Sequence, residues 1–161
     1  MTDLTSRLPD PATVLPGIMS LAAAMADVTE NGTIPPATVH LVQLRAGQLV
    51  GSTYHTVRQT GLLRDLGEKE DRITAVSSWR DAPWFTGAER VALELVEAVL
   101  SPDPAVSDDL FAAAQEHYDD RALWTLTLVI AQMCYFVPVA LIARPIPGEP
   151  FGRNYRTAAG A

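Results

Sequence analysis

The chain has 161 residues, 48% of them hydrophobic, and a formal net charge of −7. This length predicts one domain with a sizeable core, and the hydrophobic content is too high for a disordered chain. Lys69 is the only lysine and the eleven arginines are scattered. An acidic chain without clustered basic residues repels phosphate backbones, so we expect no nucleic-acid partner.

Cys134 is the only cysteine, which leaves no partner for an internal disulfide or a two-cysteine redox couple. Its neighbours are mostly apolar, so we expect a buried and inert thiol. Residues 1–11 carry acids and prolines instead of the basic stretch and apolar core of a secretory signal. We therefore expect a cytoplasmic protein.

Helical periodicity dominates the chain, and no convincing run of alternating strand residues appears. The expected fold is therefore all-α, a bundle of about six or seven helices. Prolines at 35–36, Ser52 and Ser107 are typical of helix starts, and Thr86 with Glu89 forms a capping box. In chain order, the expected helices cover residues 15–29, 35–50, 53–66, 68–79, 86–100, 107–118 and 120–144.

Residues 123–143 form an uncharged run that is long enough to span a bilayer. Thr125, Gln132 and Pro138 dilute the run, and a helix that is apolar on all sides also suits a protein core or a subunit interface. We therefore expect a buried helix kinked at Pro138, and no membrane span. Such a helix needs more burial than one small subunit offers, which favours a homo-oligomer.

Two segments carry a family signature. In the first, His40 to His55, the matching residues are Leu41, Val42, Leu44, Arg45, Gln48 and Gly51. The second, residues 79–90, fits the pattern Trp-Arg-x-Ala-Pro-x-Phe-x-x-x-Glu-Arg. Together they resemble the signature regions of the AhpD-like superfamily, which includes alkyl hydroperoxidase D and carboxymuconolactone decarboxylase.

The resemblance covers about residues 35–143 and implies a single AhpD-like helical domain over 1–161, assembled as a dimer, trimer or hexamer. Residues 10–34 would form an N-terminal helix and linker before the family-like core at 35–143. The tail, residues 144–161, is rich in Gly, Pro and Arg. We expect it to lie extended over a neighbouring surface or to be mobile.

Peroxidase chemistry in that superfamily depends on two cysteines, a glutamate and a histidine, because the thiolate is the nucleophile. This chain replaces every one of these groups. His40 stands at the glutamate position, Ser52 and His55 at the two cysteine positions, and Gln59 at the histidine position. The resemblance therefore implies a member without thiol redox chemistry.

The candidate catalytic residues are these four together with Tyr54, which lies between the former cysteine positions. Histidine can act as acid or base near neutral pH. Ser52 as N-cap would place His55 in the first turn of its helix, where the dipole disfavours imidazolium. We therefore expect His55 to be a neutral base, His40 the acid and Tyr54 an auxiliary donor. The expected reaction is isomerisation, cyclisation or decarboxylation of a small hydrophobic metabolite.

Two alternatives remain open at this point. A catalytically inactive ligand-binding or structural paralogue would have filled the pocket with polar residues that satisfy one another. An alkyl hydroperoxidase-type peroxidase is the less favoured alternative, since Cys134 stands alone. Two imidazoles without an acidic third ligand predict no metal site, and no glycine-rich phosphate loop is present. We expect no cofactor and a small-molecule ligand or substrate.

Overall fold

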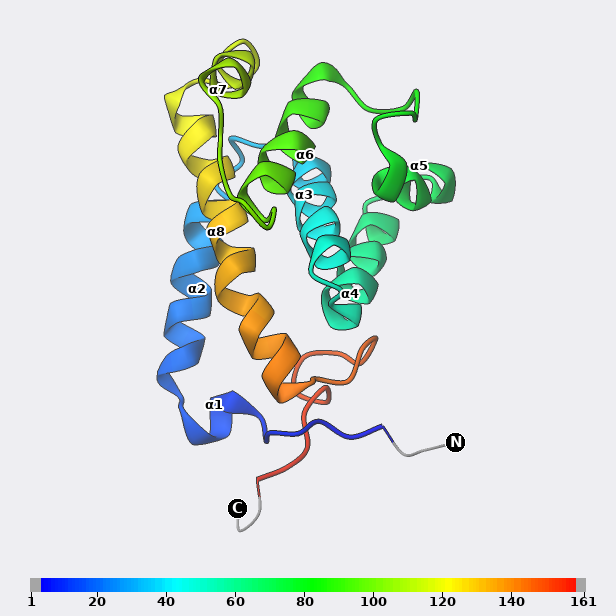
Figure 1. The fold of residues 1–161 in the computed structure, drawn as a ribbon. Coiled ribbons are helices and arrows are strands. Elements are labelled where there is room, and N and C mark those ends of the chain that lie inside the picture. The colour runs from blue at the N-terminus through cyan, green and yellow to red at the C-terminus, as the bar shows by residue number, and fades with distance from the viewer. Residues whose placement is uncertain (1–3, 159–161) are drawn as a thin grey trace.

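The computed structural model describes residues 4–158, and this part of the chain is all-helical (Figure 1). The all-α prediction is confirmed, although the described residues form eight α-helices instead of six or seven. The helices are α1 (Pro11–Val14), α2 (Gly17–Thr29), α3 (Pro36–Leu49), α4 (Thr53–Asp65), α5 (Glu70–Thr74), α6 (Gly87–Val99), α7 (Asp108–Gln115) and α8 (Asp120–Ala143), with a 3-10 turn, η1 (Ala75–Ser78), after α5.

The helix that the sequence did not predict is α1, a single turn before α2. Its cap is Asp10, whose carboxylate accepts the backbone N–H of Ala12 at 2.9 Å. The predicted helix at 15–29 begins at Gly17, after a break at Leu15 and Pro16. One turn is too short to show a hydrophobic period, which is why the pattern did not reveal it.

The three predicted caps are present at the starts of α4, α6 and α7. The hydroxyl oxygen of Ser52 accepts the backbone N–H of His55, and Ser107 caps α7 in the same way. Thr86 and Glu89 form the complete capping box, with hydrogen bonds of 3.2 and 2.9 Å. These caps place the helix starts where the sequence predicted them.

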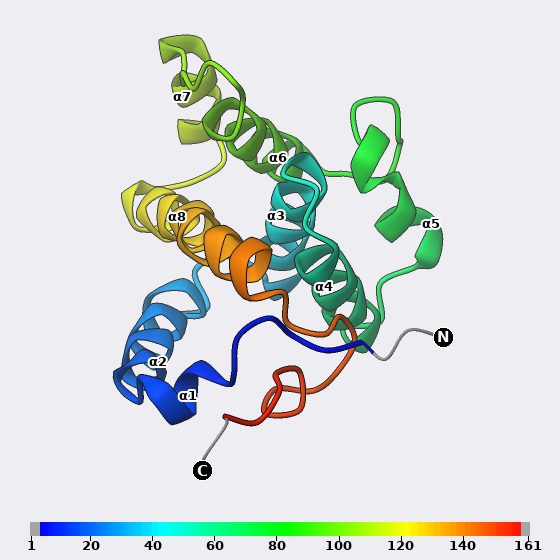
Figure 2. The ribbon, with the colours of Figure 1, turned by 60° about the horizontal axis from the view of Figure 1, so that its bottom comes forward.

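The centre of the bundle is α3, which packs against α4 on one side and against α6 and α8 on the other (Figure 2). Two apolar clusters result. The cluster shared by α3, α6 and α8 includes Val42, Ala46, Val96, Leu126 and Val129. The cluster beneath α5 and η1 includes Leu41, Leu44, Leu63, Val76 and Leu93. The apolar faces of α3 are therefore occupied, and its polar residues His40 and Gln43 bond to α4 and α8 respectively.

The signature residues of segment 79–90 hold this segment against α3 and α6. Glu97 accepts from Arg45 Nε at 2.7 Å and from Trp79 Nε1 at 2.9 Å, and it pairs with Arg80. Burial alone would raise the pKa of Glu97, but hydrogen bonds from these three donors hold it below its usual value. Arg90 donates to four backbone carbonyls within 79–85. These residues are structural and lie apart from the candidate catalytic residues.

The long helix α8 has one face in the core and one face open to solvent. The expected burial is therefore met on its inner face, whereas its outer face is exposed in the single chain. By length and composition it is the one helix in the described residues that could cross a bilayer, yet its inner face packs on α2, α3 and α7. The helix continues through Pro138 to Ala143. Cys134 lies on the open face and is exposed, which corrects the prediction of a buried thiol.

Residues 144–158 contain no helix and return beneath α4, where they run beside the N-terminal segment (Figure 2). Arg156 N donates to Ser6 Oγ at 2.9 Å, and Asp10 N donates to the Arg156 carbonyl at 3.2 Å. Asn154 is fully buried, and its backbone carbonyl accepts from Ile146 N at 2.7 Å. The tail is therefore attached to the folded chain at several points.

Candidate active site

The α3–α4 connection brings the two helices into close contact. Gly51, with φ of +67°, supplies the left-handed turn, and Ser52 N donates to the Gly47 carbonyl at 2.9 Å. A Cβ atom at Gly47 would lie 3.0 Å from His55 Cβ and 3.1 Å from Thr56 N. Glycine at this position therefore lets the first turn of α4 lie directly against the backbone of α3.

Ser52 and His55 form a buried pair at the start of α4. Ser52 Oγ lies 2.9 Å from His55 Nδ1, and the same oxygen accepts the His55 backbone N–H at 3.5 Å. The two residues are only 3% and 5% exposed. Because Oγ accepts the backbone N–H, its hydroxyl proton can be donated to Nδ1, an arrangement that places the imidazole proton on Nε2.

Burial, followed by the positive charge of Arg58, lowers the pKa of His55 to about 4. The imidazole is therefore neutral at pH 7. A neutral His55 is also expected from its place at the positive end of the α4 dipole, but loss of solvation is the larger cause. Desolvation penalises the charged ring because it has so little contact with water.

His40 and Gln59 form a second pair, one turn along the same helix contact. His40 Nδ1 lies 2.9 Å from Gln59 Oε1. Gln59 is buried on α4, whereas His40 is half-buried on α3. An amide oxygen can only accept, so Nδ1 of His40 carries the hydrogen, and the neutral ring presents a lone pair on Nε2.

Tyr54 is held by the tail. Its hydroxyl oxygen accepts from Asn154 Nδ2 at 3.1 Å, and its ring meets the His55 ring edge-on, with centroids 5.4 Å apart. Asn154 was not predicted as part of the site, because it lies 100 residues further along the chain and belongs to no helical pattern. With its oxygen already accepting, the Tyr54 hydroxyl retains its own proton for donation.

A further pair missed by the sequence analysis joins α3 to α8. Gln43 Nε2 donates to Gln132 Oε1 at 3.0 Å, and Gln43 is 7% exposed. Gln43 follows His40 by three residues, so both lie on one helix face, and Gln132 interrupts the apolar run of α8. These two signals in the sequence could have identified the pair.

The four pairs leave both Nε2 atoms without a hydrogen bond to a described residue. In the described part of the chain, no buried side-chain nitrogen or oxygen lacks a hydrogen-bond partner. Each ring is thus held at Nδ1, and its Nε2 remains available for a ligand.

The candidate residues line neither of two surface hollows of about 440 and 450 Å³. One hollow lies at the α7–α8 turn, beside Tyr118 and Arg121, and the other lies between α6 and the loop before α7. Within residues 4–158, no three His, Cys, Asp or Glu side chains are grouped closely enough to hold a metal ion.

Comparison with known proteins identifies the family. The model of the carboxymuconolactone decarboxylase family matches residues 17–98. The chain belongs to the carboxymuconolactone decarboxylase family. This match confirms the resemblance seen in the sequence. It covers all five candidate residues and ends before α8 and the tail, so Gln132 and Asn154 lie outside the matched region.

Two relatives in this family are uncharacterised proteins. YdfG of Bacillus subtilis (strain 168) is 31% identical over 121 residues, which is 74% of this chain and 82% of YdfG. YnjA of Escherichia coli (strain K12) is 42% identical over 101 residues, which is 63% of this chain and 56% of YnjA. The match thus spans little more than half of YnjA.

Solved structures share the fold. The AhpD-like protein ATU0492 of Agrobacterium tumefaciens, of unknown function, has a TM-score of 0.82 at 23% identity, covering 91% of this chain and all of its own. The debrominase Bmp8, as the C82A variant with 2,3,4-tribromopyrrole, has a TM-score of 0.69 at 14% identity, covering 94% of this chain and 78% of its own. At these identities, the likeness establishes only the common fold.

Proposed function

We propose that this family member is an acid–base enzyme without thiol chemistry, acting on a small carbonyl compound at the seam between α3 and α4. The observation that carries this proposal is the pair of imidazoles of His40 and His55. Each is fixed through Nδ1 by a neighbouring side chain, and Nε2 of each makes no hydrogen bond to a described residue. Holding catalytic rings in fixed orientation is what proton transfer requires.

In this proposal His40 is the general base. Its Nδ1–H is engaged by Gln59, so Nε2 carries the lone pair that accepts a proton from carbon. Gln59 orients the ring and keeps this tautomer. The hydrogen bonds thus favour the reverse of the roles expected from the sequence, in which His40 was the acid.

His55 is the hydrogen-bond donor to the carbonyl oxygen. With a pKa of about 4 it stays neutral, and Ser52 at Nδ1 favours a hydrogen on Nε2. A neutral imidazole can polarise a carbonyl and stabilise the developing enolate oxygen by donating a hydrogen bond, and the ring stays uncharged. Tyr54 supplies a second donor near the same ring.

The reaction class follows from these roles. His40 Nε2 takes a proton from the carbon next to a carbonyl, and the electron pair moves to the carbonyl oxygen, which accepts hydrogen bonds from His55 and Tyr54. Return of the proton at another carbon completes an isomerisation. The same stabilised enolate would form on loss of carbon dioxide from a β-keto acid.

A test is solvent exchange at carbon, followed by proton NMR in D2O on cyclic enones, unsaturated lactones and β-keto acids. A thermal-shift screen of the same compounds selects those that bind, because binding to the native state raises Tm. His40→Gln is expected to keep binding and lower the exchange rate by about 100-fold or more. The control is His117→Gln, since His117 is exposed near the end of α7. Exchange that survives His40→Gln unchanged would refute the role of His40.

An inactive ligand-binding or structural paralogue is the second candidate, favoured by the fact that every buried polar side chain in the described residues is already paired. Such a protein would bind a compound and leave its carbon-bound protons unexchanged, or bind nothing in the panel. A peroxidase needs a second thiol beside Cys134. Hydroperoxide turnover that uses a dithiol donor and is abolished by Cys134→Ser would refute both candidate functions and indicate a peroxidase.

A further inference from the structure

The two ends of the described chain form one face of the molecule. Residues 4–16 and 144–158 lie next to each other beneath the helices, at the lower end of the molecule (Figure 1 and Figure 2). An isolated β-bridge joins Pro9 of the first segment to Arg156 of the second. The two segments therefore belong to one layer, and its outer side is named the terminal face below.

Large apolar side chains of the terminal face are open to solvent. Leu4 is 73% exposed, Leu15 is 68% exposed and Phe151 is 58% exposed. Single exposed apolar residues are ordinary on a protein surface, whereas a group of them is typical of an interaction site. The full group consists of Leu4, Leu8, Val14, Leu15 and Phe151.

Exposed arginines stand on the same two segments, namely Arg7, Arg144, Arg153 and Arg156. No ion pair joins any of them to a carboxylate of the described residues. The guanidinium of Arg156 donates only to the backbone carbonyls of Arg7 and Thr157. The two segments contain only two acids, Asp10 and Glu149, and Asp10 is the cap of α1. The terminal face is therefore positive in a chain whose net charge is −7.

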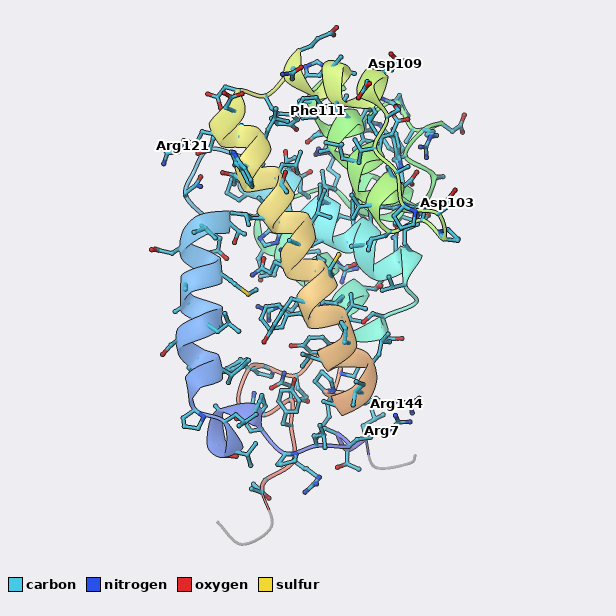
Figure 3. All side chains as sticks on the ribbon, turned by 60° about the vertical axis from the view of Figure 1, so that its left-hand side comes forward. Arg7, Asp103, Asp109, Phe111, Arg121 and Arg144 are labelled. Carbon is cyan, nitrogen blue, oxygen red and sulfur yellow. The ribbon has the colours of Figure 1, made fainter. Side chains whose placement is uncertain are left out.

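The opposite end of the molecule is acidic. Figure 3 shows Arg7 and Arg144 at the lower end, whereas Asp103 and Asp109 lie at the upper end. Residues 103–120 carry six acids and contain no lysine or arginine. Because its charges are separated in this way, the molecule approaches a negatively charged surface with its arginine end first.

We propose that the terminal face binds the surface of a membrane that contains anionic lipids. Phospholipid headgroups supply the negative charges that these arginines lack within the described chain. The hydrocarbon just below the headgroups accepts the exposed apolar side chains, as it does for proteins that lie in the membrane interface. The molecule lies on the bilayer in this arrangement, and no helix crosses it.

Other occupants fit the terminal face less well. Two terminal faces paired with each other would bring two sets of unpaired arginines together, and like charges across an interface repel. A small soluble anion such as phosphate would bind guanidinium groups but leave Leu4, Leu15 and Phe151 in water. An anionic bilayer is the partner that satisfies both kinds of side chain.

Co-sedimentation of the full chain with lipid vesicles tests the proposal. Phosphatidylcholine vesicles that contain about 30% phosphatidylglycerol are expected to bind at least tenfold more protein than vesicles of phosphatidylcholine alone. Sodium chloride at about 0.5 M should remove most of this difference, because salt screens exposed charges. No binding to the anionic vesicles, or equal binding to both kinds of vesicle, would overturn the proposal.

Two pairs of variants assign the binding to the terminal face. Arg7→Gln should weaken binding to the anionic vesicles by about fivefold, whereas Arg121→Gln, at the opposite end, should leave it unchanged (Figure 3). Phe151→Ser should weaken binding by a similar factor, and its control is Phe111→Ser, since Phe111 is 47% exposed on α7. Equal losses in the variants of both ends would refute the proposed orientation.

Protection from trypsin gives a second readout that needs no variant. Anionic vesicles are expected to slow cleavage of the wild type after Arg153 and Arg156 at least fivefold, relative to a soluble arginine peptide in the same mixture. Cleavage that the vesicles do not slow would contradict the proposal. A lower molar mass of Phe151→Ser than of the wild type in light scattering would mean that a second copy covers this face, and would overturn it. Neither readout depends on catalysis at His40 and His55.

Discussion

His55 is an ionisable side chain that the fold keeps uncharged. Its Cβ lies beside the α3 backbone at Gly47, and its Nδ1 contacts the Ser52 hydroxyl. Protonation would place a positive charge in a site that is 5% exposed and already faces Arg58. The native state therefore binds a proton at His55 less readily than the unfolded chain does. Because of this difference, the titration of His55 makes the free energy of unfolding depend on pH.

The pKa of His55 falls from 6.5 in the unfolded chain to about 4 in the native state. A depressed histidine pKa contributes stability that is fully present above pH 6.5 and is lost as the pH falls towards 4. The expected loss is about 3 kcal/mol across this window, because one pKa unit corresponds to about 1.4 kcal/mol.

Urea unfolding at pH 7.5 and pH 4, at fixed protein concentration, measures this effect against His55→Gln. The variant lacks the titrating ring but shares every carboxylate with the wild type. The free energy of unfolding of the wild type should fall by about 3 kcal/mol more than that of the variant. Parallel pH profiles for the two proteins would show that His55 is not buried as described.

The α3–α4 contact depends on a glycine inside a helix. Replacing Gly47 by alanine would gain about 1 kcal/mol of helix propensity. However, the new Cβ would lie 3.0 Å from His55 Cβ and 3.1 Å from Thr56 N, and overpacking of this kind costs about 1–3 kcal/mol. We expect Gly47→Ala to lower the free energy of unfolding by about 1 kcal/mol and to displace His55.

Gly61→Ala is the matched control for this change. Gly61 lies within α4, and a Cβ there would meet nothing within 4 Å. The same substitution should therefore stabilise the protein by up to about 1 kcal/mol. Thermal and urea unfolding of both variants measure the difference. Equal effects from the two substitutions would contradict the close approach at Gly47.

The helices were predictable where local chemistry fixes their ends. Ser52, Ser107 and the Thr86–Glu89 box act within four residues, so the sequence alone places the starts of α4, α7 and α6. In contrast, the sequence does not predict which face of a uniformly apolar helix is buried. Nothing in the run 123–143 distinguishes an inner from an outer face, and Cys134 was consequently placed on the wrong side.

The candidate site was predictable only where its contacts join residues that are close in the sequence. The Ser52–His55 pair is a first-turn contact, which an N-cap three residues before a histidine predicts. The approach of His40 to Gln59 spans 19 residues, and only the family resemblance placed both among the candidate catalytic residues. Asn154 belongs to an irregular segment with no periodic pattern, so its contact with Tyr54 could be seen only in the folded chain.

One of the contacts that attach the tail to the rest of the molecule is made by a buried side chain. Asn154 is fully buried, donates to the Tyr54 hydroxyl, and accepts from Gly152 N at 3.2 Å. Asn154→Leu would remove both hydrogen bonds, and a hydrogen bond of this kind contributes about 0.5–1.5 kcal/mol. The tail should detach while the helices stay folded, because the apolar clusters do not include it.

Limited digestion with trypsin, analysed by mass spectrometry, reports on this detachment. Cleavage after Arg153 and Arg156 should be at least tenfold faster in Asn154→Leu than in the wild type, with the far-ultraviolet circular dichroism unchanged. Glu149→Gln, an exposed change in the same segment, is the control. If both variants are cut at the wild-type rate, Asn154 does not hold the tail.

The pairing of the tail with the N-terminal segment also has a consequence for the order of folding. The contact of Ser6 with Arg156 joins positions 150 residues apart, and that of Tyr54 with Asn154 joins positions 100 apart. Contacts this distant carry a large loop-closure entropy and form after local ones. On the ribosome, α3 and α4 can bring His40, Gln59, Ser52 and His55 together before residue 154 has been synthesised. The Tyr54 hydroxyl is therefore fixed late in folding, only after residue 154 has been synthesised and the tail has reached α4.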